Sequence, residues 1–274
     1  MSDYELLDSG DGRKLERFGP YILDRPSLQS VWRPKLGKEE WNRAHAKFTR
    51  EPDGLWEKKR GFPDEWAIEV EGIKFKLAPT DFGHLGIFPE QRSCWKWIQN
   101  HLGKGANVLN LFAYSGGSTM AAALAKAQAT HLDASKKMCG WARENAVLNS
   151  LEEAPVRWIV DDVKKFLKRE VRRKNRYDAI ILDPPSFGRG AKGEVFKIEK
   201  DIQDILSDCK ELLSEQPLFV LLTCHSPGFT PIAMSHLLAQ FFPEGDVEAG
   251  EMVLEGDENV FPLPSGSFAR WRPC

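Results

Sequence analysis

The sequence predicts an α/β fold: a doubly wound, mostly parallel sheet of seven strands, with a small N-terminal appendage that contains β-structure. Two observations support this prediction. From residue 107 onward, short apolar runs of strand length alternate with segments of helical pattern. Before residue 83 this alternation is missing, and closely spaced prolines interrupt any long helical period. We therefore assign residues 1–82 to the appendage and residues 83–274 to the α/β domain.

The appendage is expected to begin with an irregular region over residues 1–65 that holds only short extended pieces. Residues 66–70 and 74–77 then alternate around Glu71-Gly72, which predicts a β-hairpin. Four tryptophans stand among Lys and Arg residues in or beside the irregular region, at positions 32, 41, 56 and 66. They fit either base stacking on a nucleic acid or anchoring by apolar burial, and we favour burial for most of them.

The α/β domain is expected to begin with a helix that starts at Phe88-Pro89-Glu90 and ends at Gly103. Because the later apolar runs lack polar alternation, we expect them to be buried on both faces, as strands of a parallel sheet are. The predicted strands are 107–112, 130–133, 156–160, 177–183, 218–223, 247–254 and 267–271. The predicted helices lie at about 116–126, 135–149, 162–174, 199–213 and 230–241.

Composition places the chain among ordinary globular proteins, since 42% of its 274 residues are hydrophobic and 28% are charged. No apolar run is long enough to cross a membrane, and the N-terminus lacks the apolar region of a secretory signal. The five cysteines have no paired spacing, which favours a reducing cytoplasm over disulfides or a metal site. We expect a cytoplasmic protein without a bound metal or a membrane partner.

The first strand–turn–helix unit predicts the place of a cofactor. Its turn carries Gly116-Gly117, which lets the backbone bend sharply and approach a ligand, but it matches neither the dinucleotide nor the phosphate-loop pattern. Asp133 ends the second strand, and Asp161-Asp162 follow the third. Each acid alone fits a helix cap, whereas together they can accept hydrogen bonds from ribose and adenine. The set predicts an adenosine site without a pyrophosphate anchor, as S-adenosylmethionine would need.

The fourth strand leads into a candidate substrate site. Asp183 is followed by Pro184 and Pro185, which stiffen the loop because each proline restricts its own φ and the residue before it. A carboxylate and rigid carbonyls there can accept hydrogen bonds from the amino group of a base, and Phe187 can stack on the ring. A plain turn at the end of a strand is the alternative interpretation.

The local charge distribution is compatible with RNA as a partner, and equally with an ordinary surface. Residues 11–60 hold more Lys and Arg than Asp and Glu, although the net charge of the chain is only −2. Arg189 and Lys192 lie in the glycine-rich segment after Phe187, where they could contact phosphates. An unevenly charged surface and a plain flexible loop remain the alternatives.

Residues 83–223 resemble the class I S-adenosylmethionine-dependent methyltransferases, and are most similar to the bacterial 23S ribosomal RNA cytosine-C5 group. The resemblance rests on GIFPEQR (86–92), VLNLFAYSGG (108–117), DASKKMCGWARENAVLN (133–149), DDVKKFLKR (161–169) and YDAIILDPPSFGRG (177–190). It implies the class I methyltransferase fold and methylation of a base in RNA, with ribosomal RNA as the expected substrate, at cytosine C5 or an exocyclic amine. A small-molecule or protein methyltransferase, or a non-catalytic RNA-binding assembly factor, are the alternatives.

The resemblance also implies roles for individual residues. Those expected to bind the cofactor are Phe88, Gln91, Asn110, Phe112, Tyr114, Ser115, Gly116, Asp133, Ser135, Asp162, Val163 and Asp183. Those expected to take part in catalysis are Asp183, Pro184, Pro185, Phe187 and Cys224. Cys224 stands in LLTCHSPGF where the cytosine-C5 enzymes resemble TFSCS, so the cysteine is displaced by about two positions and Ser226 takes its place.

Overall fold

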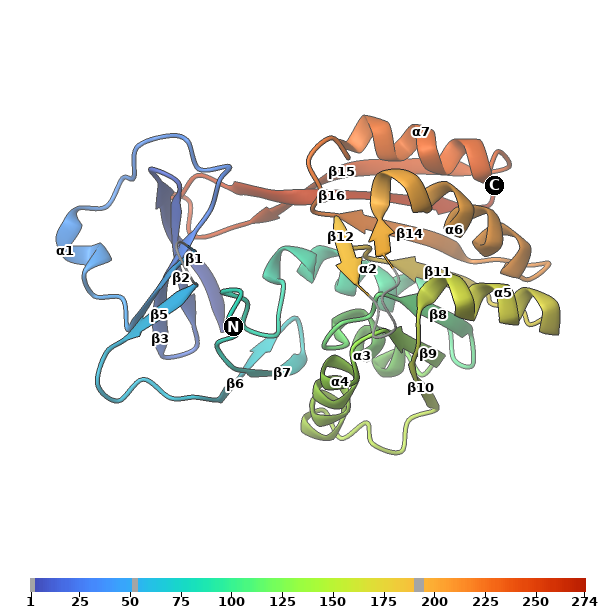
Figure 1. The fold of residues 1–274 in the computed structure, drawn as a ribbon, viewed down its shortest axis with the longest axis horizontal. Helices are drawn as coiled ribbons and strands as arrows, with labels where there is room; N and C mark the ends of the chain where they lie inside the picture. The colour runs from blue at the N-terminus through green and yellow to red at the C-terminus, as the bar shows by residue number, and fades with distance from the viewer. Residues whose placement is uncertain (1–2, 51–53, 190–194) are drawn as a thin grey trace. The chain divides into compact units, whose positions relative to one another are not determined.

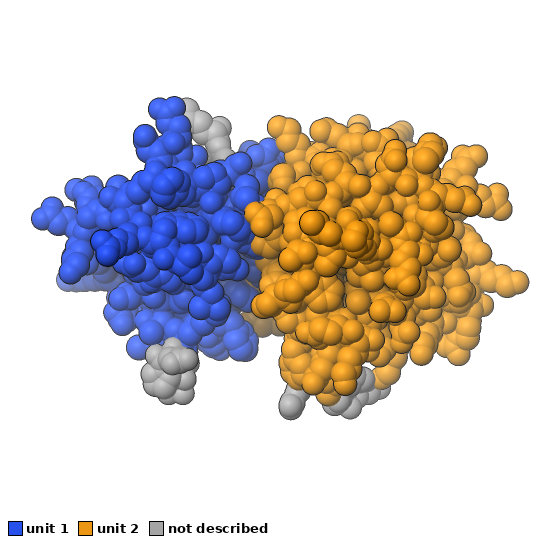
Figure 2. All heavy atoms as spheres, turned by 90° about the horizontal axis from the view of Figure 1, so that it is seen from above, with its two compact units in different colours: residues 1–92, 253–265 blue, residues 93–252, 266–274 orange. Residues whose placement is uncertain are grey.

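The computed structural model describes residues 3–50, 54–189 and 195–274. The chain divides into two compact units, shown in blue and orange in Figure 2. Unit 1 comprises residues 1–92 and 253–265, and unit 2 comprises residues 93–252 and 266–274. The boundary that we drew between residues 82 and 83 therefore lies inside unit 1, which also includes a segment from near the C-terminus.

The main sheet has seven strands within the described residues, in the order β10-β9-β8-β11-β14-β16-β15. The first five of these run parallel to their neighbours, and β16 is antiparallel to β14. The winding direction changes between β8 and β11, so the predicted doubly wound, mostly parallel sheet is confirmed. The strands are β8 (Asn107–Leu111), β9 (Gln128–Asp133), β10 (Val156–Val160), β11 (Ala179–Leu182), β14 (Phe219–Cys224), β15 (Asp246–Leu254) and β16 (Leu263–Arg272).

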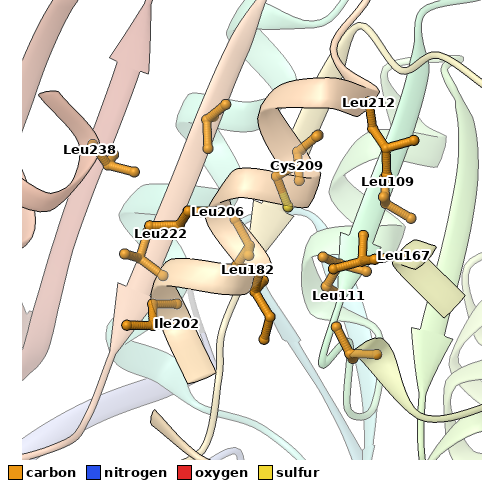
Figure 3. Close-up of a cluster of buried hydrophobic side chains, with 14 of the residues drawn as sticks. Leu109, Leu111, Leu167, Leu182, Ile202, Leu206, Cys209, Leu212, Leu222 and Leu238 are labelled. Carbon is orange, nitrogen blue, oxygen red and sulfur yellow. The ribbon is translucent and has the colours of Figure 1, made fainter. Parts of the chain in front are cut away.

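Helices cover both faces of this sheet (Figure 1). One face packs against α5, α6 and α7, through the core cluster of which Figure 3 labels ten members. The pleat turns alternate residues to opposite faces of the sheet. Leu109 and Leu111 therefore join this cluster, while Asn110 between them makes a hydrogen bond to Thr119 of α3. The helices are α2 (Arg92–His101), α3 (Gly117–Leu124), α4 (Lys136–Leu148), α5 (Val163–Arg173), α6 (Ile198–Leu212) and α7 (Pro231–Phe241).

Three of these helices begin at a polar side chain that caps the first turn. Ser135, Asp162 and Thr230 each accept a hydrogen bond from the amide three residues further on. Such caps satisfy amides that the helix itself leaves unpaired, which is why the chain turns from strand to helix at these positions.

Unit 1 is more regular than the sequence predicted. A five-stranded sheet, within the described residues, occupies most of the region that we expected to be irregular. The signal that we missed is Asp11-Gly12, whose positive φ values of 50° and 74° make the tight turn between the first two strands. The strands are β1 (Tyr4–Gly10), β2 (Arg13–Phe18), β3 (Tyr21–Pro26), β4 (Ala46–Thr49) and β5 (Leu55–Lys58).

Further elements of unit 1 follow the prediction more closely. The hairpin of β6 (Trp66–Val70) and β7 (Ile73–Leu77) is confirmed, and the helix at residue 89 begins as a short 3-10 turn, η1 (Pro89–Gln91). A single turn, α1 (Lys38–Trp41), precedes β4.

In unit 2, the chain after Pro185 forms a small antiparallel pair, β12 (Phe187–Arg189) and β13 (Val195–Lys197).

The tryptophans of unit 1 make structural contacts. The indole nitrogens of Trp32, Trp41 and Trp56 donate to Ser9 O, Asp8 Oδ2 and Thr80 O, at 2.8 to 3.0 Å. Trp66 packs edge to face against the rings of Tyr21 and Phe62. Bonded indoles of this kind anchor loops to the sheet, in agreement with the burial interpretation.

The contact between α3 and α2 can be tested at Gly117. A Cβ at this position would lie 2.8 Å from two ring carbons of the buried Trp95, so Gly117→Ala should destabilise the protein by about 1–3 kcal/mol. Gly140, on the exposed side of α4, has nothing within 4 Å of its ideal Cβ, and Gly140→Ala should stabilise by about 0.5–1 kcal/mol. Urea denaturation of both variants measures the difference. Equal effects would mean that Trp95 moves aside without cost.

Candidate functional site

The predicted site residues of unit 2 gather at one edge of the parallel sheet. Leu111 pairs with Leu132 on one side and with Leu182 on the other, so β8, β9 and β11 end at nearly the same level. Leu182 also pairs with Leu222 of β14. The loop after β8, Asp133, Asp183 and the end of β14 therefore leave the sheet side by side, at the switch point where ligands bind in such folds.

The loop between β8 and α3 (residues 112–116) has a strained backbone. Phe112 and Tyr114 have φ values of 56° and 50°, in the left-handed region that side chains other than glycine rarely adopt. Gly116 has a φ of 90°, and a Cβ there would lie 3.0 Å from the Cβ of Ala142. Strain of this kind persists only where surrounding contacts hold it, and it is concentrated at binding sites.

Asp133 holds this loop in place. Its Oδ2 accepts from the amide of Tyr114 at 2.9 Å, and its Oδ1 accepts from the amide of Ser135 at 2.8 Å. Burial raises the pKa of the Asp133 carboxyl, and the two amides lower it in part. A desolvated carboxylate that accepts one amide at each oxygen can still accept from hydroxyl groups, as the hydroxyls of a ribose would require.

A buried polar chain lies beneath the loop. Asn110 Nδ2 donates to Thr119 Oγ1 at 2.9 Å, and Thr119 Oγ1 lies 2.9 Å from His131 Nδ1. Burial lowers the pKa of His131 to about 3, so the ring is neutral at physiological pH. The side chain of Asn110 thus joins β8 to α3, while Ser115 O accepts from Asn145 Nδ2 at 2.9 Å and joins the loop to α4.

The acids after β10 make the contacts of a helix start. Asp162 Oδ1 accepts from the amide of Lys165 at 3.0 Å as the cap of α5, and Asp161 forms an ion pair with Arg169. Val163 is the first residue of α5 and is buried. Asp162 stands two residues beyond Val160, which pairs with Asp133 of β9, so it lies at the same edge of the sheet as Asp133.

Asp183 is held by residues of the neighbouring strand. Its Oδ1 accepts from Thr223 Oγ1 at 2.8 Å and lies 3.6 Å from His225 Nδ1. Ser226 Oγ donates across the same gap to Ser186 Oγ at 2.7 Å. We did not predict these partners. The one signal for them is that the fourth and fifth strands of a doubly wound sheet are neighbours, so that their ends meet.

The other loop residues differ in exposure. Pro184 is buried and Pro185 is exposed, while Phe187 opens β12 with 50% of its surface accessible. Arg189 ends β12, and Lys192 lies outside the described residues. The segment that follows Asp183 thus carries an exposed aromatic ring, which can stack on a base.

Cys224 faces the core and not the site. It is 1% exposed, belongs to the cluster beneath α6 and α7, and its Sγ accepts from the amide of Ser226 at 3.3 Å. Burial raises the pKa of the Cys224 thiol, which disfavours the thiolate that nucleophilic attack would need.

Two predicted cofactor residues lie in unit 1. Gln91 ends η1 and is buried, and Phe88 directly precedes η1, with its ring 5.2 Å from that of His84.

Among the described residues, no group of three or more His, Cys, Asp or Glu side chains could hold a metal ion. No helix in the described part of the chain is long and apolar enough to cross a membrane.

The strand order defines a doubly wound α/β protein, and the strained loop lies at its switch point, where the sequence predicts an adenosine site. Comparison with known families identifies it further: the family model of S-adenosylmethionine-dependent methyltransferases matches residues 37–241, so the chain belongs to this family. S-adenosylmethionine is therefore its cofactor, and when bound it supplies an electrophilic methyl group on a sulfonium. The chemistry of the sheet edge fits this cofactor, because the desolvated carboxylate of Asp133 can accept from hydroxyl groups and the glycine turn leaves no side chain at Gly116.

Individual relatives agree with this assignment. The crystal structure of the SAM-dependent methyltransferase from Agrobacterium tumefaciens is 40% identical, with a TM-score of 0.95 over 100% of this chain and 91% of that one. The ribosomal RNA large subunit methyltransferase K/L of Hahella chejuensis is 36% identical over 161 residues, 58% of this chain and 22% of that protein. The K/L protein of Pseudoalteromonas atlantica is also 36% identical, over 71% of this chain and 26% of that protein.

The chain thus spans about a quarter of the length of these K/L relatives. Their names point to large-subunit ribosomal RNA, and they do not single out the cytosine-C5 group to which the sequence resemblance pointed.

The cofactor site can be tested at Asp133. S-adenosylmethionine at a hundred times its Kd should stabilise the wild-type protein by about 2.7 kcal/mol, and Asp133→Ala should lose most of this gain. Thermal unfolding with and without the cofactor measures both. Asp178→Ala is the matched control, because Asp178 Oδ2 likewise accepts from a backbone amide, that of Asn107, but at the opposite edge of the sheet. A full cofactor response in Asp133→Ala would contradict the assignment.

Proposed function

We propose that the protein methylates a base in ribosomal RNA, and that the acceptor is an amino group of the base. The observation that carries this proposal is the loop at the end of β11, where Thr223 holds the carboxylate of Asp183 and Phe187 is half exposed. The names of the K/L relatives support ribosomal RNA as the substrate.

The loop supplies what transfer to an amine needs. The carboxylate of Asp183 and the carbonyl of Pro184 accept hydrogen bonds from the amino group, which keeps the nitrogen lone pair directed at the methyl carbon. Bound S-adenosylmethionine would supply the methyl group, and its sulfur would keep the electron pair of the broken carbon–sulfur bond. Asp183 would stabilise the positive charge on the attacking nitrogen until that nitrogen releases its proton to water, and stacking on Phe187 would fix the plane of the base.

Methylation at cytosine C5 is the second candidate, because Cys224 lies at the end of β14. That reaction requires a thiolate that adds to carbon 6 of the base. The burial of Cys224, its place in the core cluster and the raised pKa of its thiol favour the amine instead. Amine transfer needs no covalent bond between protein and RNA.

We also propose that unit 1 contacts the RNA. The basic residues Lys58, Lys59 and Arg60 are exposed or partly exposed at the end of β5 and just after it. Lys58 pairs with Asp64 at 2.8 Å and Lys59 donates to Asn42 O at 2.5 Å. These local bonds order the two ammonium groups, and a phosphate can share them because both side chains stay in solvent.

Asp183→Asn should lower turnover by about two orders of magnitude or more, because the amide can no longer offset the positive charge on the nitrogen. Methyl incorporation from S-adenosylmethionine into ribosomal RNA from cells that lack the gene measures this. Asp204→Asn, the same change at an exposed position of α6, should leave turnover unchanged. Near-normal turnover in Asp183→Asn would show that the loop is only a structural turn at the end of the strand.

Cys224→Ala and Cys224→Ser should both retain full activity in the same assay. Cys209→Ala, which removes an equally buried thiol of the same core cluster, controls for the loss of packing. If activity disappears in the Cys224 variants alone while cofactor binding persists, the reaction is C5 methylation, and a 5-fluorocytosine RNA should then trap a covalent adduct.

Replacing Lys58, Lys59 and Arg60 together by Gln should weaken RNA binding and flatten its dependence on salt. Titration of ribosomal RNA fragments at several salt concentrations measures both quantities. The control is the same replacement at Lys168, Arg172 and Lys174, which are exposed on and just after α5. An identical salt slope for the two triple variants would exclude a specific RNA contact at residues 58–60.

A further inference from the structure

His225 is the first residue after β14, and it approaches the carboxylate of Asp183. β11 and β14 are neighbouring parallel strands, with Leu182 paired to Leu222, so the residues that follow them leave the sheet together. His225 Nδ1 lies 3.6 Å from Asp183 Oδ1, and the two side chains are 31% and 24% exposed. Neither the family match nor the sequence motifs give this histidine a role.

The backbone of β16 leaves room for the ring. Gly266 has a φ of 139°, and a Cβ there would lie 3.1 Å from His225 Cδ2 and 2.9 Å from the carbonyl oxygen of Cys224. β16 pairs with β14 at Ser267 and Cys224, so Gly266 adjoins the end of β14 where His225 begins. The missing side chain at Gly266 therefore allows the imidazole to lie against β16 with Nδ1 toward Asp183.

The neighbouring thiol is not the target of this histidine. Successive residues of a strand point to opposite faces, and Cys224 points into the core cluster while Thr223 points to Asp183. The carboxylate that the structure pairs with His225 is that of Asp183.

Thr223 and His225 approach the same oxygen of Asp183. The hydroxyl makes a hydrogen bond at 2.8 Å, whereas 3.6 Å from the imidazole is an ion-pair distance and too long for a hydrogen bond. Catalytic hydrogen bonds are often long without substrate and shorten when it binds. Two donors on one oxygen would prevent the carboxylate from rotating, which is how supporting residues preorganise a site.

We infer that His225 is a positioning residue: with Thr223 it fixes the carboxylate of Asp183 in the orientation that the substrate amine requires. The inference rests on the proposed function for the role of Asp183. In this role His225, which follows β14 and lies beside Gly266 of β16, determines the geometry of the loop after β11.

The contact itself can be tested without any substrate. The imidazole nitrogen resonances of His225 in ¹⁵N NMR spectra should shift between the wild-type protein and Asp183→Asn, because the anionic partner of the ring is gone. The resonances of His236, exposed on α7, should not change. Identical His225 resonances in the two proteins would overturn the inference and leave the proposed function untouched.

The effect of the contact between His225 and Asp183 on the reaction is tested by three substitutions. They are assayed with S-adenosylmethionine and ribosomal RNA from cells that lack the gene. His225→Ala should lower kcat about tenfold with little change in KM, because the contact matters most in the transition state. His225→Asn keeps a donor near Nδ1 and should recover most of the loss. His225→Phe keeps the ring without a donor and should not.

The outcomes distinguish a failure of the role of His225 from a failure of the proposed function. Normal turnover in His225→Ala, recovery by Phe, or equal losses in Ala and Asn would each overturn the role of His225, provided that thermal unfolding shows folded variants. In those cases an inactive Asp183→Asn would still support the proposed function. Normal turnover in Asp183→Asn would instead reject the proposed function first.

Discussion

Parallel hydrogen bonding between neighbouring strands is the constraint on which the candidate site depends. Because Leu111 pairs with both Leu132 and Leu182, three chain segments far apart in sequence end at the same level. A slip of one residue would turn every side chain of a strand to the other face, so the close packing of the buried central strands β8, β11 and β14 against the helices holds the register. The functional edge is thus a consequence of how the core packs.

The strained loop after β8 shows how that edge is used. Left-handed backbone at Phe112 and Tyr114 costs on the order of 1–3 kcal/mol at each residue. The bond from the Tyr114 amide to the Asp133 carboxylate offsets part of this cost, since bonds to charged groups contribute about 1.5–3 kcal/mol. One carboxylate therefore shapes the loop that we propose as the cofactor site, so a change at Asp133 would affect both the loop and the stability of unit 2.

The pleat of β14 has a corresponding effect on the chemistry. Thr223 and Cys224 are adjacent in sequence and point to opposite faces, so the hydroxyl reaches Asp183 while the thiol is buried in the core. The same sheet edge therefore provides a held carboxylate and an exposed aromatic ring. The Cys224 thiol, which would have to act as the nucleophile in C5 methylation, is buried in the core instead. That distribution of groups is the physical basis for proposing an amine acceptor over carbon 5 of cytosine.

The sequence by itself determined the order of strands and helices in the α/β part, the glycine turn and the placing of Asp133 and Asp183 at strand ends, because these follow from local periodicity and turn chemistry. It did not reveal the five strands of unit 1, where we overlooked the Asp11-Gly12 turn. Only the tertiary structure decided that Thr223 and His225 meet Asp183 and that Cys224 does not. Those contacts depend on strand pairing and on the direction of each side chain, which no single segment of the sequence encodes.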